Sequence, residues 1–295
     1  MKRRVRLVIT DLDNTLYDWV TFYVTAFYQM ADAAAAILGV TTDRIVDDLA
    51  QVHRDTGNTE QPFGLLQAAV VQAKLPDSSV GERTEILDPA FHAFNRARKR
   101  HLQLYAGVLE TIETIVQSCP LVALTEATAA NAAFRLRTLG LDSSFDRIVA
   151  REDTLAIPLD PTILEKYSSI YSKMDFIPSG RAKPDPDLIL SITSRYWVEP
   201  ADVLYVGDSL ERDVLMGNDA GVLTAWARYG KSYDPACWER LVRITCWTDE
   251  DLTRQREALG GKSEILPDIT LTDGFQQLLD YVDFVPVNQL QSRKE

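Results

Sequence analysis

Two short apolar runs that each lead into aspartate constrain the fold of this chain most strongly. Residues 5–10 read Val-Arg-Leu-Val-Ile-Thr before Asp11, and residues 203–207 read Val-Leu-Tyr-Val-Gly before Asp208. Runs of this length, rich in β-branched residues, indicate buried strands. Further runs of the same kind, separated by helical patterns, lie at 121–125, 147–150 and 222–226. This alternation predicts an α/β fold, a doubly wound parallel sheet with helices on both faces.

A block of helical pattern interrupts the alternation after the first strand. It extends over residues 18–103, and we interpret it as a smaller α-helical domain. Residues 1–17 and 104–295 would then form the catalytic core, which agrees with a length of 295 residues at roughly 150 per domain. The apolar stretch 19–38 contains Gln29 and Asp32, so a buried amphipathic helix explains it better than a membrane span.

The charge and cysteine content exclude several classes of partner. The chain has 31 basic and 43 acidic residues, a formal net charge of −12. Such an acidic chain has no global field for a nucleic acid polymer or an anionic membrane, so a phosphate-bearing ligand needs locally supplied positive charge. Three cysteines without CxxC spacing argue against a disulfide framework or a zinc site. We therefore expect a soluble, cytoplasmic protein without a membrane or nucleic acid partner.

Carboxylates follow two of the predicted strands. Asp11 and Asp13 follow the first strand, and Asp208 and Asp213 follow the strand at 203–207. In open α/β sheets, ligands bind beyond the carboxyl ends of the strands, where these side chains would converge. Because clustered carboxylates repel one another, a hard divalent cation is the simplest way to stabilise them, and oxygen ligands suit Mg²⁺.

The same edge of the sheet carries the groups that phosphate chemistry needs. Asp11 and Asp13 alternate in extended backbone and project to one side, so one can attack while the other exchanges a proton. Lys183 begins a Lys-Pro-Asp-Pro loop and can supply positive charge, and the hydroxyl of Thr125 can donate to a phosphoryl oxygen. Each motif alone also occurs as a turn or a helix cap. Their order, each at a strand end or in the adjoining loop, favours an active site.

This constellation resembles the haloacid-dehalogenase-like (HAD) superfamily of hydrolases. Residues 11–17 are similar to its first motif, Thr125 to its second, Lys183 to its third and residues 207–213 to its fourth. The resemblance implies a Rossmann-like core with the helical block as a cap. It also implies Asp11 as nucleophile and Asp13 as general acid/base. Mg²⁺ would be held by the Asp11 and Asp208 carboxylates and the backbone carbonyl of Asp13, with Asp213 in support.

The resemblance favours the phosphatase branch of the superfamily, because dehalogenases of this type lack an acid at the position of Asp13 and phosphatases need one. We therefore expect a Mg²⁺-dependent phosphomonoester hydrolase that acts through an aspartyl-phosphate. Its substrate would be a small soluble phosphorylated metabolite, such as a sugar phosphate, a nucleotide or phosphoglycolate. A phosphotransferase or mutase and a non-catalytic binding module remain alternatives. The apolar helix pattern at 19–38 is also compatible with a homodimer through the cap.

Three features depart from the family pattern or carry no assigned role. Glu126 stands where many relatives carry asparagine. The segment between Thr125 and Lys183 is long, and we interpret residues 153–178 as a surface addition. Residues 227–267 are also longer than the pattern requires, and no function is assigned to them.

Overall fold

The computed structural model describes residues 2–153, 165–250, 252–253 and 264–287. The chain divides into two compact units. The first, called the sheet unit here, comprises Met1–Asp18, Gln103–Ser232 and Ser263–Glu295. The second, called the helical unit, comprises Trp19–Leu102 and Tyr233–Lys262.

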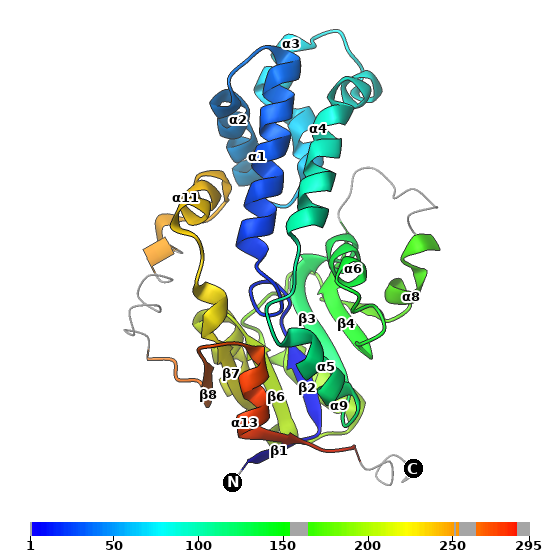
Figure 1. The fold of residues 1–295 in the computed structure, drawn as a ribbon, viewed down its shortest axis with the longest axis vertical. Coiled ribbons are helices and arrows are strands. Elements are labelled where there is room, and N and C mark those ends of the chain that lie inside the picture. The colour runs from blue at the N-terminus through cyan, green and yellow to red at the C-terminus, as the bar shows by residue number, and fades with distance from the viewer. Residues whose placement is uncertain (1, 154–164, 251, 254–263, 288–295) are drawn as a thin grey trace. The chain divides into compact units, whose positions relative to one another are not determined.

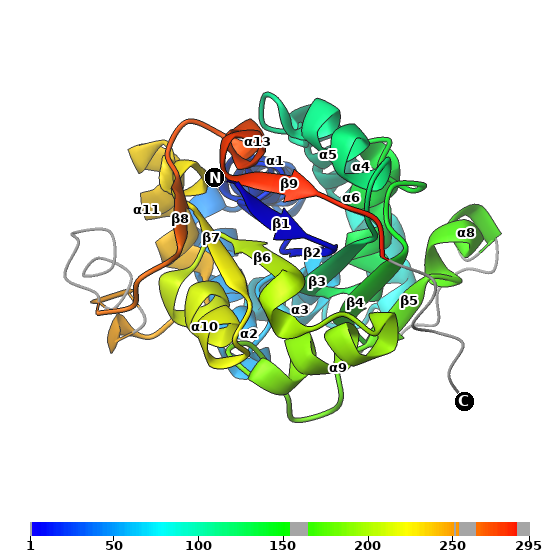
Figure 2. The same cartoon turned by 90° about the horizontal axis from the view of Figure 1, so that it is seen from below.

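A parallel sheet organises the first unit (Figures 1 and 2). Within the described residues its seven strands run in the order β5-β4-β3-β2-β6-β7-β8. Their bounds are β2 Leu7–Thr10, β3 Leu121–Thr128, β4 Arg147–Arg151, β5 Met174–Phe176, β6 Val203–Gly207, β7 Leu223–Ala227 and β8 Ile269–Leu271. β2 is the first strand of this sheet along the chain and is central, because Ile9 pairs with Val122 on one side and Tyr205 on the other. The carboxyl ends of β2, β3 and β6 therefore lie next to one another.

Helices cover both faces of this sheet. Figure 2 shows α5 (Val108–Val116) and α6 (Ala129–Thr138) on one face, and α9 (Pro186–Tyr196) and α10 (Leu215–Asp219) on the other. Apolar side chains of α9 and of the central strands form a buried core, which includes Leu7, Ile9, Val122, Leu188, Ile189 and Tyr205. The predicted doubly wound parallel fold is confirmed. Burial on both faces explains why its strands read as continuous apolar runs rather than as alternating ones.

Several short elements of the sheet unit had no clear signal in the sequence. The edge strand β5 has three residues, and β1 (Arg3–Val5) pairs in parallel with β9 (Val282–Phe284) in a separate small sheet. The described residues just before β5 contain one short helix, α8 (Ser168–Tyr171). The proposed surface addition at 153–178 includes residues outside those described.

The helical unit contains three long helices from its first segment. These are α1 (Trp19–Leu38), α2 (Thr42–Thr56) and α4 (Val80–His101), with η1 (Pro62–Gln67) and α3 (Ala69–Lys74) between them. Local chemistry sets their ends. Ser79 and Glu82 form a reciprocal capping box at the start of α4, and Gly57 ends α2 with a φ of 63°. Among the described residues no single helix could cross a membrane, although the bent pair α1 and α2 is long and apolar enough together.

The helical unit has a second segment from the later part of the chain, Tyr233–Lys262. We expected residues 104–295 to belong to the catalytic core, and that assignment stays a prediction. The amphipathic helix α11 (Pro235–Ile244) contacts α1 and α2, and its side chains Leu241 and Ile244 are buried. His53 of α2 lies 2.7 Å from the carbonyl oxygen of Ile244 through its Nδ1 atom. Burial of this apolar face explains why the segment joins the helices.

Candidate active site

A tight loop places Asp11 at the carboxyl end of β2. The backbone N–H of Asp11 donates to the carbonyl of Val206 in β6, at 2.8 Å. Beyond it the chain turns back on itself, with the N–H of Asn14 donating to the carbonyl of Tyr17 at 2.9 Å. Asn14 has a φ of 56°, which asparagine tolerates better than most residues. The loop therefore leaves the Asp11 side chain beside the end of β6.

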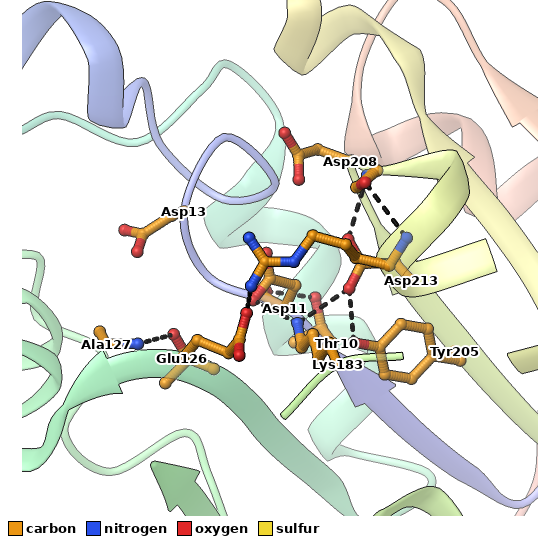
Figure 3. Close-up of polar contacts among 12 residues, drawn as sticks. Thr10, Asp11, Asp13, Glu126, Ala127, Lys183, Tyr205, Asp208 and Asp213 are labelled. Atoms are coloured by element: carbon orange, nitrogen blue, oxygen red, sulfur yellow. Dashed lines mark hydrogen bonds and ion pairs between the residues drawn. The ribbon is translucent and has the colours of Figure 1, made fainter. Parts of the chain in front are cut away.

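Three of the predicted site carboxylates come together at this edge (Figure 3). Asp11, Asp208 and Asp213 are all buried, and each offers an oxygen within 4.8 Å of the others. Asp208 follows β6 directly, and Asp213 lies in the short π-helix η3 (Leu210–Val214). Gly207 makes room for this arrangement, because a Cβ atom there would overlap the Asp213 side chain.

Lys183 neutralises part of this cluster. Its Nζ atom lies 2.8 Å from Asp11 Oδ1 and 2.8 Å from Asp213 Oδ1. Asp213 also accepts hydrogen bonds from the Tyr205 hydroxyl at 2.8 Å and from the Ser209 backbone N–H at 3.0 Å. Asp213 thus has protein donors on both oxygens, which suits a residue that supports the site from behind.

Burial and neighbouring charge shift the pKa values of these groups in opposite directions. Burial raises the pKa of Asp11, Lys183 lowers it, and the carboxylates of Asp213, Asp208 and Asp13 raise it further. Burial alone would raise the pKa of Asp213, but Lys183 and the donated hydrogen bonds bring it below its usual value. Burial alone would lower the pKa of Lys183, but Asp11 and Asp213 hold it well above its usual value. Lys183 and Asp213 therefore stay charged near neutral pH.

Two predicted site residues lie outside this carboxylate group. The Asp13 side chain points away from Asp11 in Figure 3, and both of its oxygens lie 2.9 Å from Nη1 of Arg135. Arg135 belongs to α6 and is buried. Thr125 is buried in β3, where its Oγ1 accepts the N–H of Ala127 at 3.1 Å. The sequence carried no signal for Arg135, because an arginine within a helix is ordinary.

Glu126, the departure from the family pattern, forms ion pairs with arginines. Its carboxylate contacts Arg151 at the end of β4, with 2.5 Å between Nη2 and Oε1, and it also contacts Arg212 of η3. Glu126 therefore connects the end of β3 to two neighbouring elements of the same edge.

Sequence reasoning also missed Lys231. Its Nζ atom lies 2.6 Å from Asp208 Oδ2, at the end of η4 (Arg228–Lys231), which follows β7. Burial raises the pKa of Asp208, and Lys231 is the main group that acts against this rise. The signal was available, because Lys231 lies four positions after the end of β7, in the region that we searched after other strands.

The donor set fits a hard divalent cation. Three buried carboxylates present oxygens within 4.8 Å of one another, and oxygen is the ligand that Mg²⁺ prefers. The partial neutralisation by Lys183 leaves negative charge that a cation would balance. Asp11 and Asp208 are the residues best placed to hold it.

Comparison with known proteins identifies the class to which this fold and site belong. The family model of the haloacid dehalogenase-like hydrolases matches residues 5–221, well over half of the chain. The chain therefore belongs to the haloacid dehalogenase-like hydrolases, as its motifs predicted.

Two curated relatives and one solved structure are similar to this chain. The glyceraldehyde 3-phosphate phosphatase of Methanopyrus kandleri is 23% identical over 78% of this chain and 87% of its own length. Phosphoglycolate phosphatase 1 of Pseudomonas aeruginosa is 27% identical over 78% of this chain and 72% of its own. The crystal structure of a 2-haloacid dehalogenase from Pseudomonas syringae covers 94% of this chain and 97% of its own, with a TM-score of 0.56 and 20% identity. That last likeness bears on the fold alone.

Proposed function

We propose that this chain is a Mg²⁺-dependent phosphomonoester hydrolase that acts on a small soluble phosphorylated metabolite. The observation that carries the proposal is the buried Asp11 carboxylate beside Lys183, with Asp13 two residues further along the loop. Two relatives that align with most of their length are phosphatases of small phosphorylated compounds. Sugar phosphates, nucleotides and phosphoglycolate remain the candidate substrate classes.

The proposed reaction has two halves. In the first, an oxygen of the Asp11 carboxylate attacks phosphorus, the ester P–O bond breaks, and Asp13 gives its proton to the departing alcohol oxygen. In the second, water attacks the phosphorus of the aspartyl-phosphate and gives its proton to Asp13. This step releases inorganic phosphate and restores Asp11. Asp13 must turn from Arg135 toward the substrate to serve both halves.

The remaining residues stabilise charge on the transferring group. Lys183 lies against Asp11 and can also contact phosphoryl oxygens, while the Thr125 hydroxyl can donate to one of them. When bound at Asp11 and Asp208, with the Asp13 backbone carbonyl as a further ligand and Asp213 in support, Mg²⁺ would supply charge neutralisation of the phosphoryl oxygens.

The first test measures hydrolysis of an aryl phosphate with Mg²⁺ and with EDTA. We expect metal-dependent turnover in the wild type, abolished in Asp11→Asn and unchanged in the matched surface variant Asp283→Asn, whose side chain is exposed. A panel of phosphoglycolate, triose phosphates, sugar phosphates and nucleotides then identifies the substrate. A folded wild type that hydrolyses none of these would contradict the proposal. Transfer of phosphate to a second sugar instead of water would favour the mutase alternative.

Two further expectations have their own tests. The cytoplasmic location, which the cysteine content of the sequence favours, stays a prediction for cell fractionation. A homodimer through the helical unit stays a prediction for light scattering.

A further inference from the structure

Lys231 brings a second ammonium group to the carboxylate cluster. Its Nζ atom lies 2.6 Å from Asp208 Oδ2, and the two side chains are only 13% and 10% exposed. The other ammonium, of Lys183, contacts Asp11 and Asp213 instead. Lys183 therefore contacts two of the three carboxylates, and Lys231 contacts the third, that of Asp208.

The backbone around Lys231 packs against the loop that follows β2. The hydroxyl of the preceding Tyr229 donates to the carbonyl of Thr15. Gly230 lies so close to the carbonyl of Asn14 that a Cβ atom would overlap it. The lysine is thus carried by a segment packed against the loop after β2, which distinguishes it from a solvated surface lysine.

We propose that Lys231 competes with a divalent cation for the Asp208 carboxylate and so sets how tightly this site binds metal. The inference deepens the proposed function and rests on the metal site within it. Mg²⁺ binds oxygen at about 2.0–2.1 Å, so a metal on the oxygen that Lys231 contacts would lie at most about 4.7 Å from the ammonium. Two cations that close repel each other, and the ammonium must withdraw or share the carboxylate.

The balance of charge points in the same direction. When all three carboxylates are ionised they carry three negative charges, and the two ammonium groups offset two of these. Without Lys231 the cluster would carry one more unpaired negative charge in a buried place, where the attraction for a cation is stronger than in water. Removal of the ammonium therefore tightens metal binding, whereas loss of an ordinary structural contact would weaken it.

The test is isothermal titration calorimetry of the full-length protein with Mg²⁺ alone. We expect Lys231→Met to lower the dissociation constant for Mg²⁺ at least tenfold. Lys231→Arg, which keeps the positive charge, should stay within threefold of the wild type. The matched control is Arg228→Met in the same η4 segment, where the guanidinium lies over the Trp226 ring, and it should leave the constant unchanged.

The outcomes separate this inference from the proposed function. Binding in the wild type that Asp208→Asn abolishes supports the metal site. If Lys231→Met then binds Mg²⁺ no more tightly than Arg228→Met, or if Lys231→Arg tightens binding as much as Lys231→Met, the competition is refuted while the site stands. Mg²⁺ binding by none of the variants would overturn the metal site and this inference together. Thermal melting of each variant checks that it is folded.

Discussion

Removal of the Lys183 ammonium tests the electrostatics of the site most directly. The side chain is 3% exposed, and its Nζ atom lies 2.8 Å from each of two buried carboxylates, Asp11 and Asp213. Lys183→Met keeps most of the side-chain length and leaves both carboxylates without this counter-ion. Breaking a buried ion pair by removing one partner costs about 3–5 kcal/mol. We expect about 3 kcal/mol, because burial already raises the pKa of Asp11 and protonation can relieve part of the cost.

The directions of the pKa shifts of Lys183 and Asp213 set the pH at which stability is measured. The pKa of Lys183 is raised in the folded state, so its stabilisation is present below the unfolded pKa of about 10.4 and is lost as pH rises through the folded pKa. The pKa of Asp213 is lowered, so its stabilisation is present above the unfolded pKa of about 3.9 and is lost as pH falls through the folded pKa. At pH 7.5 both contributions are complete.

The assay is urea unfolding followed by circular dichroism at pH 7.5. The matched control is Lys2→Met, the same substitution at an exposed pair with Asp283, 3.8 Å apart, for which a loss below about 1 kcal/mol is expected. Mg²⁺ should recover more stability in Lys183→Met than in the wild type, because the freed carboxylates bind it more tightly. A loss in Lys183→Met no larger than in Lys2→Met would refute the assignment of Lys183 as the counter-ion of this cluster.

Two other substitutions test the packing of the site and the attachment of α11. Gly207→Ala should lower the free energy of unfolding by about 1–3 kcal/mol and remove most activity, because the new methyl group displaces Asp213. The control Gly81→Ala in α4 should not destabilise the fold. Activity retained in Gly207→Ala would show that Asp213 can move without loss. Burial lowers the pKa of His53, so the unfolded state takes up a proton below about 6.5 and stability falls as pH drops toward the folded pKa. The fall in urea midpoint between pH 7.5 and 5.5 should be smaller in His53→Gln, and an equal fall in both proteins would contradict this account of the contact with Ile244.

The acidic half of the site could be predicted from the sequence because its residues follow strands. Asp11 and Asp208 stand directly after two apolar runs, and parallel strands bring such positions to one edge whatever the intervening chain does. Asp213 and Lys183 lie in short segments near that edge, and the structure places them in contact. The order and direction of the strands were sufficient to predict that these acidic residues lie at one edge of the sheet.

The partners of those residues depend on side-chain reach, which sequence spacing does not encode. Arg135 meets Asp13 from the second half of a helix, 122 positions along the chain. Glu126 could be recognised as unusual, but its pairing with Arg151 follows from the adjacency of β3 and β4. Residues 235–244 do carry a helix signature, with Asp234 as N-cap before Pro235. These residues belong to the helical unit because α11 contacts α1 and α2, and such contacts cannot be predicted from the periodicity of the segment.

The two-segment construction of the helical unit constrains how this protein can be recombined with its relatives. An exchange of the helical unit that cuts the chain only near residues 18 and 103 would leave α11 of this protein behind, without its own α1 and α2. The apolar face of Leu241 and Ile244 would then lose its contacts with α1 and α2 and lie open to solvent. A transplanted helical unit must therefore carry Trp19–Leu102 and Tyr233–Lys262 together, and substitutions on either segment would need matching changes on the other.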